Sequence, residues 1–501
     1  MRRIRASALL GAALFSATAL AGTGPTAGAA SKPPPSSIKL DPSLPVHPAL
    51  QYGAQVEPDK KVRVIVQKDR PERDARDIAS SAGAKLNEEF RLVKSVVLEL
   101  PQKDVLKLAR NPHVRYVSPD GRVKHRTVDG SQLTTTYPSG VTATNVWNAG
   151  GSVSATGNGV TVAVLDTGLN AANPDFSPGK ALAVNVNTTS TITTDGYGHG
   201  THVAGIIASN SQTGQYLGVA PNATILSVKI SDDSGVAQES DMLRGLQWVY
   251  DNRATYNIKV VNISSAVGTA ESYKTSPIDA AVEQLWLNGI TVVVASGNTG
   301  SAPDAVSYAP ANDPFVITVG CVDDNLTATS YTDDSLCTFS SRGITQDGYA
   351  KPEVVAPGRH IVSSLSSPSS ILAQELPDHV SSDGLHIRLS GTSMAAPVVA
   401  GAVALLLERV PSLTPNVIKG LLQTTSRNYP GQADSAGEID AFSAVTNAAT
   451  GISPTANAGL VPTAGINTAT NTVGWSSYYW DSYYWDSYYW DSYYWDKSSY
   501  D

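Results

Sequence analysis

The feature that most constrains the fold is a series of apolar runs that alternate with helix-like segments between about residues 141 and 449. Each run is short, mostly apolar and continuous enough to be a strand buried on both faces. Strands that alternate with helices form parallel βαβ units, so we predict a three-layer α/β domain with a mainly parallel sheet. The predicted strands are 161–165, 224–230, 260–264, 291–296 and 315–322, and the predicted helices are 199–210, 277–288 and 394–410.

The N-terminus has the pattern of a secretory signal peptide over residues 1–30. Arg2, Arg3 and Arg5 precede an apolar run over 8–20, and Ala27-Gly28-Ala29 offers a small-residue cleavage site. This run is too short to span a bilayer, and no later segment reaches about 18 uninterrupted apolar residues. We therefore expect a secreted protein without a membrane span.

Composition divides the rest of the chain. Residues 31–57 are rich in Pro and Ser and predict a linker. Residues 58–126 alternate as strand, helix, strands, helix and strand, which indicates a small α+β fold of ferredoxin-like type. The α/β domain is assigned to 127–450, a second linker to 451–476, and a tail to 477–501, where Ser-Tyr-Tyr-Trp-Asp occurs four times.

Charge separates the same segments. Residues 1–126 carry 22 Lys/Arg and 12 Asp/Glu, whereas residues 127–501 carry 14 and 32. An acidic body argues against nucleic acid as a partner. It also favours docking of the basic N-terminal segment onto the body.

Three motifs in the α/β domain carry candidate catalytic residues. Asp166 lies in D-T-G after a predicted strand, His199 opens H-G-T-H-V-A-G at the start of a predicted helix, and Ser393 lies in G-T-S-M-A-A-P at the start of another. Each motif alone also fits a structural role. Together, in the chain order Asp, His, Ser, they are typical of one of the unrelated folds that build a serine nucleophile. The chain therefore resembles the subtilisin-like serine proteases, the subtilases.

The resemblance implies a subtilisin-like catalytic domain preceded by an inhibitory prodomain over 58–126. Asp166 would orient His199, His199 would act as the base, and Ser393 would be the nucleophile. The segment Ala295-Ser296-Gly297-Asn298 matches the family's oxyanion segment, so Asn298 would stabilise the tetrahedral oxygen. His202, one helical turn after His199, is expected to be structural.

Two further segments resemble the strands that flank a subtilase substrate. They are Gly235-Val236-Ala237 and Ser264-Ser265-Ala266, and Ala295 and Gly297 would line the same cleft. Ala266 stands where the family commonly has Gly, and Glu239 where an apolar residue often lines an outer subsite. Glu239 predicts either tolerance for basic substrate residues or a solvated acidic loop. The segment 363–389 is longer than its family counterpart, and either gates the cleft or decorates it.

Metal enters only through the resemblance, and catalysis needs no cofactor. Asp175 and Gln212 stand where many subtilases bind a structural calcium ion, although Gln212 replaces the usual Asn. The alternative is a hydrogen-bonded loop. Cys321 and Cys337, the two cysteines of the sequence, predict either a disulfide in an exported protein or two buried thiols.

The sequence thus predicts a monomeric, secreted serine endopeptidase that cleaves protein or peptide substrates and is made as a self-processed zymogen with its own prodomain as a partner. The competing interpretation is a noncatalytic surface or adhesion protein whose aromatic tail does the work. Repeated aromatic rings suit stacking on polysaccharide or the cell surface, and the alternative is an extension without a ligand.

Overall fold

The computed structural model describes residues 40–475, with gaps at 42, 71–73, 126–134, 152, 212–214, 329, 433–434 and 468–471. The predicted signal peptide, the start of the first linker and the aromatic repeats lie outside the described residues. Gln212 and Arg126 do so as well. Below, residues 40–125 are called the N-terminal region and residues 135–463 the α/β body.

The α/β body is built on an eight-stranded sheet with the strand order β14-β13-β12-β10-β6-β8-β7, in which β17 also pairs with β13. All neighbours are parallel except β13 and β14. The predicted strands and the mainly parallel sheet are confirmed. The strands are β6 (Thr161–Asp166), β7 (Ala181–Asn185), β8 (Thr224–Lys229), β10 (Ile258–Ile263), β12 (Thr291–Ala295), β13 (Ile317–Asp323), β14 (Ser335–Leu336) and β17 (Val354–Pro357).

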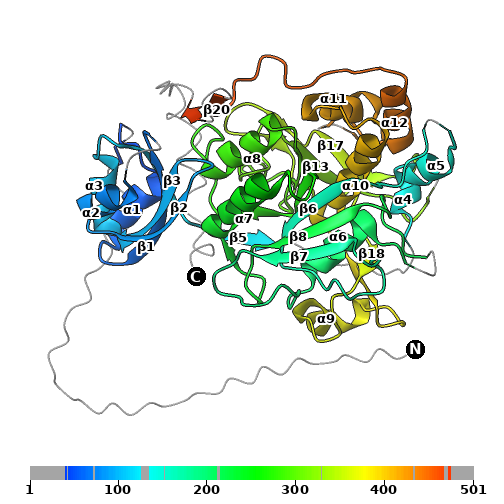
Figure 1. Cartoon of the computed structure of the whole chain (residues 1–501), viewed down its shortest axis with the longest axis horizontal. Coiled ribbons are helices and arrows are strands. Elements are labelled where there is room, and N and C mark those ends of the chain that lie inside the picture. Colours follow the sequence, from blue (N-terminus) through cyan, green and yellow to red (C-terminus); the bar gives the residue numbers. More distant parts are fainter. Residues whose placement is uncertain are drawn as a thin grey trace, which may run out of the picture. The chain divides into compact units, whose positions relative to one another are not determined.

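Helices cover both faces of this sheet (Figure 1). One layer holds α7 and α8, which pack against each other, and the other holds α6 and α10. The helices of the body are α4 (Tyr137–Gly140), α5 (Ala143–Asn148), α6 (His199–Ala208), α7 (Glu239–Asn252), α8 (Pro277–Leu287), α9 (Ile371–Glu375), α10 (Thr392–Arg409), α11 (Pro415–Thr425) and α12 (Ala441–Ala449). Within the described part of the chain, α10 alone is long and apolar enough to cross a membrane, and 89% of it is buried in the protein core.

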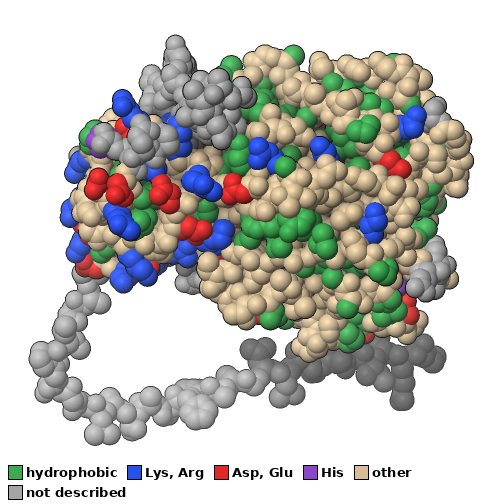
Figure 2. All heavy atoms as spheres, in the orientation of Figure 1, with side chains coloured by type: hydrophobic (Ala, Val, Ile, Leu, Met, Phe, Trp, Pro, Cys, Tyr) green, Lys and Arg blue, Asp and Glu red, His purple; other side chains and the backbone are tan. Residues whose placement is uncertain are grey.

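The N-terminal region contains a four-stranded antiparallel sheet in the order β2-β3-β1-β4. This order and the alternation of strands with helices are those of the predicted ferredoxin-like fold. Charged side chains of both signs gather over these elements on the face shown in Figure 2. The elements are α1 (Pro48–Val56), β1 (Lys61–Lys68), α2 (Ala75–Ser81), β2 (Lys85–Phe90), β3 (Ser95–Pro101), the 3₁₀ turn η2 (Gln102–Asp104), α3 (Val105–Ala109), β4 (Val114–Pro119) and β5 (Arg122–His125).

The predicted linker over 31–57 is wrong in its last part, because residues 48–56 form α1. Pro48 occupies the first helical position, where the missing N–H costs nothing, and the His47 side chain accepts from Ala49 N at 3.2 Å. Pro48 therefore marks the start of a helix, although the composition of this stretch predicted a linker.

Three small sheets add to the two main ones, and the first of them includes β5 of the N-terminal region. They are β9 (Ala237–Gln238) and β11 (Ser265–Val267), which both pair with β5, β15 (Gly343–Ile344) with β16 (Ala350–Lys351), and β18 (Ile361–Ser364) with β19 (His386–Leu389). The long segment over 363–389 thus includes most of a hairpin, with α9 and the 3₁₀ turn η3 (Pro377–His379) between its strands.

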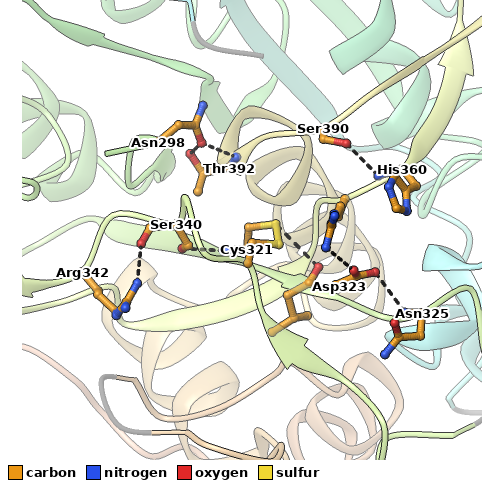
Figure 3. The surroundings of a disulfide bond; sticks show 12 residues. Asn298, Cys321, Asp323, Asn325, Ser340, Arg342, His360, Ser390 and Thr392 are labelled. Atoms are coloured by element: carbon orange, nitrogen blue, oxygen red, sulfur yellow. Dashed lines mark hydrogen bonds and ion pairs between the residues drawn. A yellow bond between two sulfur atoms is a disulfide. The ribbon is translucent and has the colours of Figure 1, made fainter. Parts of the chain in front are cut away.

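Cys321 on β13 forms a disulfide with Cys337, which confirms the predicted bridge (Figure 3). The Cα atoms of the two residues lie 5.4 Å apart, and both residues are buried. Ser340 Oγ accepts from Cys321 N at 2.9 Å, and Arg359 Nη1 pairs with Asp323 Oδ2 at 2.8 Å beside it.

Residues 452–463, which the sequence assigned to a linker, are hydrogen-bonded to the rest of the body. Ala456 N donates to Asn416 O at 3.0 Å, Asn457 Nδ2 donates to Phe315 O at 2.9 Å, and Thr463 N donates to Glu283 Oε2 at 2.6 Å. Beyond it, β20 (Ala464–Asn467) pairs with β21 (Thr472–Trp475).

Candidate active site

The acid and the base of the predicted triad meet at the carboxyl end of the sheet. Asp166 is the last residue of β6, and ligand sites of parallel sheets lie at this edge. His199 is the first residue of α6, and its Nδ1 lies 2.8 Å from Asp166 Oδ1. Both side chains are fully buried.

Glycine permits this close contact at the start of α6. Gly198, the N-cap, has φ +106°, which L side chains rarely adopt. A Cβ on Gly200 would lie 2.4 Å from Gly168 O. The two glycines therefore let the first turn of α6 rest on the Asp166-Thr167-Gly168 turn, which brings His199 to Asp166.

The charge of His199 is set by two opposing effects. Burial disfavours the imidazolium, but the Asp166 carboxylate, through its charge and its hydrogen bond, and the Asp195 carboxylate together raise the pKa of His199 above its ordinary value. A base with a raised pKa takes up a proton more readily.

Ser393 is the second residue of α10 and is fastened to the end of β10. Its Oγ donates to Ser264 O at 3.0 Å, and Ser264 Oγ donates back to Ser393 O at 2.9 Å. Asn262 Nδ2 donates to Ser264 Oγ at 3.0 Å. This ladder of contacts fixes the start of α10 against the strand next to β6.

Asn298 lies at the same helix start, as the sequence predicts. Its Oδ1 accepts from Thr392 N at 2.9 Å and from Thr392 Oγ1 at 3.1 Å, and Gly297 N donates to Thr392 Oγ1 at 3.1 Å (Figure 3). These hydrogen bonds hold the Asn298 side chain against Thr392, the residue that precedes Ser393. Backbone N–H groups and the helix dipole at this end favour a developing negative charge.

The two strands that were predicted to flank a substrate are paired with another segment of the chain. The backbone of β5 lies between β9, which contains Ala237, and β11, which contains Ser265 and Ala266. His125 is opposite Ser265, and Lys124 is opposite Ala266. A peptide strand therefore fits this cleft by pairing on both edges.

The remaining residues predicted to line the cleft lie before β9 and at the end of β12. Gly235 has φ +82°, and a Cβ there would lie 2.7 Å from the Tyr197 ring, whereas Val236 is 40% exposed. Ala295 ends β12 next to the Gly297 turn.

Glu239 is not part of a solvated loop. It begins α7, is 3% exposed, and its backbone N donates to Gly121 O at 2.6 Å. Burial, together with the carboxylates of Glu271 and Asp120, raises the pKa of Glu239 well above its ordinary value. No pattern in the sequence indicates this environment, because the residues around Glu239 are distant in the chain and include Asp120 and Gly121 of the N-terminal region.

The expected structural role of His202 agrees with its surroundings. Its Nε2 lies 3.2 Å from Ile361 O and 3.0 Å from Ile387 O, and burial lowers its pKa to about 3.

The carboxylate of Asp175, one of the two residues of the implied calcium site, is already paired with other side chains of the protein. Its Oδ2 lies 3.0 Å from His386 Nε2 and accepts from Ser364 Oγ at 2.5 Å. His386 also pairs with Asp383 Oδ2 at 2.8 Å and stacks on Tyr216. Among the described residues no cluster of three or more His, Cys, Asp or Glu side chains could hold a metal ion. The long 363–389 segment therefore contributes an imidazole that pairs with Asp175, whereas Gln212, the other residue of the implied calcium site, lies outside the described residues, so calcium binding stays a prediction.

Asp195 is a further residue of the site that the motifs did not single out. It is buried four positions before His199, and it joins the first turn of α6 to Thr167. The only sign of this role in the sequence is that an aspartate stands shortly before the Gly-His-Gly motif that contains His199.

Comparisons with known proteins agree with this geometry. Residues 157–456 match the Subtilase family. Serine protease AprX of Bacillus subtilis is 41% identical over 279 residues, which are 54% of this chain and 61% of AprX. Subtilisin E of the same organism is 32% identical over 353 residues, which are 70% of this chain and 80% of subtilisin E.

Among solved structures, fervidolysin from Fervidobacterium pennivorans, a keratinolytic enzyme related to subtilisin, superposes with a TM-score of 0.60 at 26% identity. The match covers 77% of this chain and 61% of fervidolysin.

Proposed function

The chain belongs to the subtilase family of serine proteases, and we propose that it acts as a secreted endopeptidase through Asp166, His199 and Ser393. The observation that carries this proposal is the 2.8 Å contact between His199 Nδ1 and Asp166 Oδ1 at the edge of the sheet where α10 presents Ser393. The same edge carries Asn298 and a cleft that accepts a peptide strand.

The reaction follows from these positions. Asp166 accepts a hydrogen bond from the Nδ1–H group of His199, which keeps the proton on Nδ1 and leaves Nε2 as the basic nitrogen. Nε2 takes the proton of Ser393 Oγ as Oγ attacks the peptide carbonyl, and then gives that proton to the leaving amine. The oxyanion is stabilised by the Asn298 amide and Ser393 N, and water hydrolyses the acyl-enzyme by the same steps in reverse.

The N-terminal region acts as an inhibitory prodomain that the enzyme removes from itself. Support comes from β5, which fills the cleft between β9 and β11 as a substrate strand would. The register places His125 opposite Ser265, one residue from Ser264, whose carbonyl accepts from Ser393 Oγ. We therefore expect cleavage within two residues of His125, close to the predicted boundary at 126.

Other contacts hold the N-terminal region on α7. Arg244 Nε donates to Glu88 Oε1 at 2.7 Å, and Leu92 N donates to Gln247 Oε1 at 2.5 Å. Arg63 Nη2 donates to Ser240 Oγ at 2.9 Å. In the Arg244–Glu88 pair the cation belongs to the acidic body and the anion to the basic N-terminal region. Complementarity between individual side chains therefore adds to the attraction between the net charges.

Export and the tail complete the proposal. The leader over 1–30 directs secretion, and the Cys321–Cys337 disulfide suits an oxidising compartment. The aromatic repeats over 477–501 would contact polysaccharide or the cell surface.

A serine-directed phosphonate probe tests the catalytic part. The mature protein should be labelled on Ser393, and Ser393→Ala should not be labelled. Ser369→Ala, which changes an exposed serine of the 363–389 segment, should be labelled as the wild type is. A folded wild-type protein that takes no label would support the noncatalytic surface protein instead.

A further inference from the structure

Asp195 is a buried carboxylate that accepts three hydrogen bonds at the start of the helix that carries His199. Its Oδ1 accepts from Gly198 N at 2.7 Å and from Thr167 Oγ1 at 2.8 Å, and its Oδ2 accepts from Thr201 N at 2.8 Å. It is 3% exposed. Two of the donors are backbone amides of the first turn of α6, where the helix dipole also favours an anion.

Thr167 connects this carboxylate to the acid of the triad. Its Oγ1 accepts from Gly200 N at 2.8 Å while donating to Asp195, and its N donates to Asp166 Oδ1 at 2.7 Å. Asp166, Thr167, Asp195 and the amides around His199 thus form one connected set of hydrogen bonds. This set spans the gap between the end of β6 and the start of α6.

The long segment before the nucleophile closes the far side of the set. Ser366 Oγ donates to Asp195 O at 2.6 Å, and Asn170 N donates to Thr201 Oγ1 at 3.0 Å. The backbone of Asp195 and the first turn of α6 are therefore held from two directions.

The set serves more than stability because Asp195 also acts on the charge of His199. Burial raises the pKa of Asp195, but the hydrogen bonds from Gly198, Thr201 and Thr167 oppose this effect by favouring the anion. The charge of that anion helps to raise the pKa of His199.

We propose that Asp195 is a positioning residue for catalysis, which acts through Thr167 and the first turn of α6 to fix His199 against Asp166 and places a second negative charge beside the imidazolium. This inference rests on the proposed function, because it assumes that His199 is the base. Asp195 does not touch the substrate. It determines the geometry and the proton affinity of the residue that does the chemistry.

The test uses Asp195→Asn, which keeps the shape, removes the charge and turns an NH₂ group toward a backbone or hydroxyl donor. Turnover per phosphonate-titrated site is expected to fall about ten- to hundredfold with KM nearly unchanged, since small misplacements of a catalytic base cost this much. The acid limb of the pH profile should shift to lower pH, because His199 loses a negative neighbour.

Thr167 supplies matched variants. Thr167→Ser keeps the hydroxyl bridge and should stay within about twofold of wild type, whereas Thr167→Val removes it and should lose activity as Asp195→Asn does. The double variant should lose much less than the product of the two single losses. Should Asp195→Asn fail to accumulate as folded protein, the Thr167 pair decides the question.

A second readout does not depend on turnover. In the full chain carrying Ser393→Ala, the His199 ring is titrated by NMR with and without Asp195→Asn, and its pKa should be lower in the double variant. An unchanged His199 pKa, with unchanged turnover per labelled site, would reduce Asp195 to a purely structural residue and overturn the proposal. Absence of label on wild-type protein would instead refute the proposed function itself.

Discussion

The buried carboxyl of Glu271 offers a quantitative test of how the N-terminal region is held. Ser118 Oγ, from the N-terminal region, donates to Glu271 Oε1 at 3.1 Å, and Glu239 and Asp120 lie in the same buried cluster. Burial raises the pKa of Glu271 from 4.5 to about 7, although the hydrogen bonds from Ser118 and Thr275 oppose this. When the N-terminal region leaves, water reaches this carboxyl and its pKa returns toward the ordinary value.

The sign follows from proton linkage. A carboxyl whose pKa is higher in the docked state binds a proton on docking, so its contribution is fully favourable below pH 4.5 and is lost as the pH rises to about 7. The shift corresponds to about 3 kcal/mol at most, or roughly a hundredfold in affinity. His47 works in the opposite direction: burial lowers its pKa to about 4, so it disfavours docking as the pH falls below 6.5.

Glu271→Gln isolates the carboxyl, because Gln keeps an oxygen for Ser118 and leaves His47 unchanged. Inhibition of the mature wild-type and variant enzymes by the separate segment 40–125 is measured from pH 4.5 to 8 with a small peptide substrate. The ratio of the two inhibition constants should be near one at pH 4.5 and should rise to as much as about a hundredfold in favour of the variant above pH 7. A ratio that does not change with pH would refute this reasoning.

Three other predictions follow from single contacts. Asn298→Ala should lower kcat by about 10² to 10³ with little change in KM, the loss that removal of such a donor causes in subtilisin, and a change confined to KM would contradict an oxyanion role. His386→Ala should destabilise the protein by about 1–3 kcal/mol, because it leaves the buried Asp175 carboxylate without its imidazole partner. EDTA should leave the melting temperature unchanged, and a large loss of stability in EDTA would show that calcium binds. Truncation after Trp475 should leave peptide hydrolysis within about twofold, whereas truncation after Gly451 should lower the melting temperature because Ala456, Asn457 and Thr463 lose their contacts; equal melting temperatures would show that these contacts contribute nothing.

The sequence predicted the sheet well because its strands are buried on both faces. In the run 161–165 every residue after Thr161 is apolar, and β6 (Thr161–Asp166) differs from that prediction by one residue. In contrast, β2 (Lys85–Phe90) is an edge strand of mostly polar residues, and its alternation of half-buried and exposed side chains gives little apolar signal.

The residues of the site also fall into two groups, those that a local sequence pattern identifies and those that it does not. Asp166, His199, Ser393 and Asn298 belong to local motifs, so they could be found from the sequence, and the structure brings Asp166 to His199 and Asn298 to the start of α10. The roles of Glu239 and Asp175 depend on partners more than a hundred residues away, Gly121 and His386. Such pairings come from the tertiary fold and leave no local pattern.

Intact mass measurement of the secreted protein tests the central claim most directly. The wild-type chain should lose every residue up to within two positions of His125, and Ser393→Ala, expressed alone in a host without other proteases, should keep the N-terminal region. A Ser393→Ala protein that is cut at the same bond would contradict self-processing by this site.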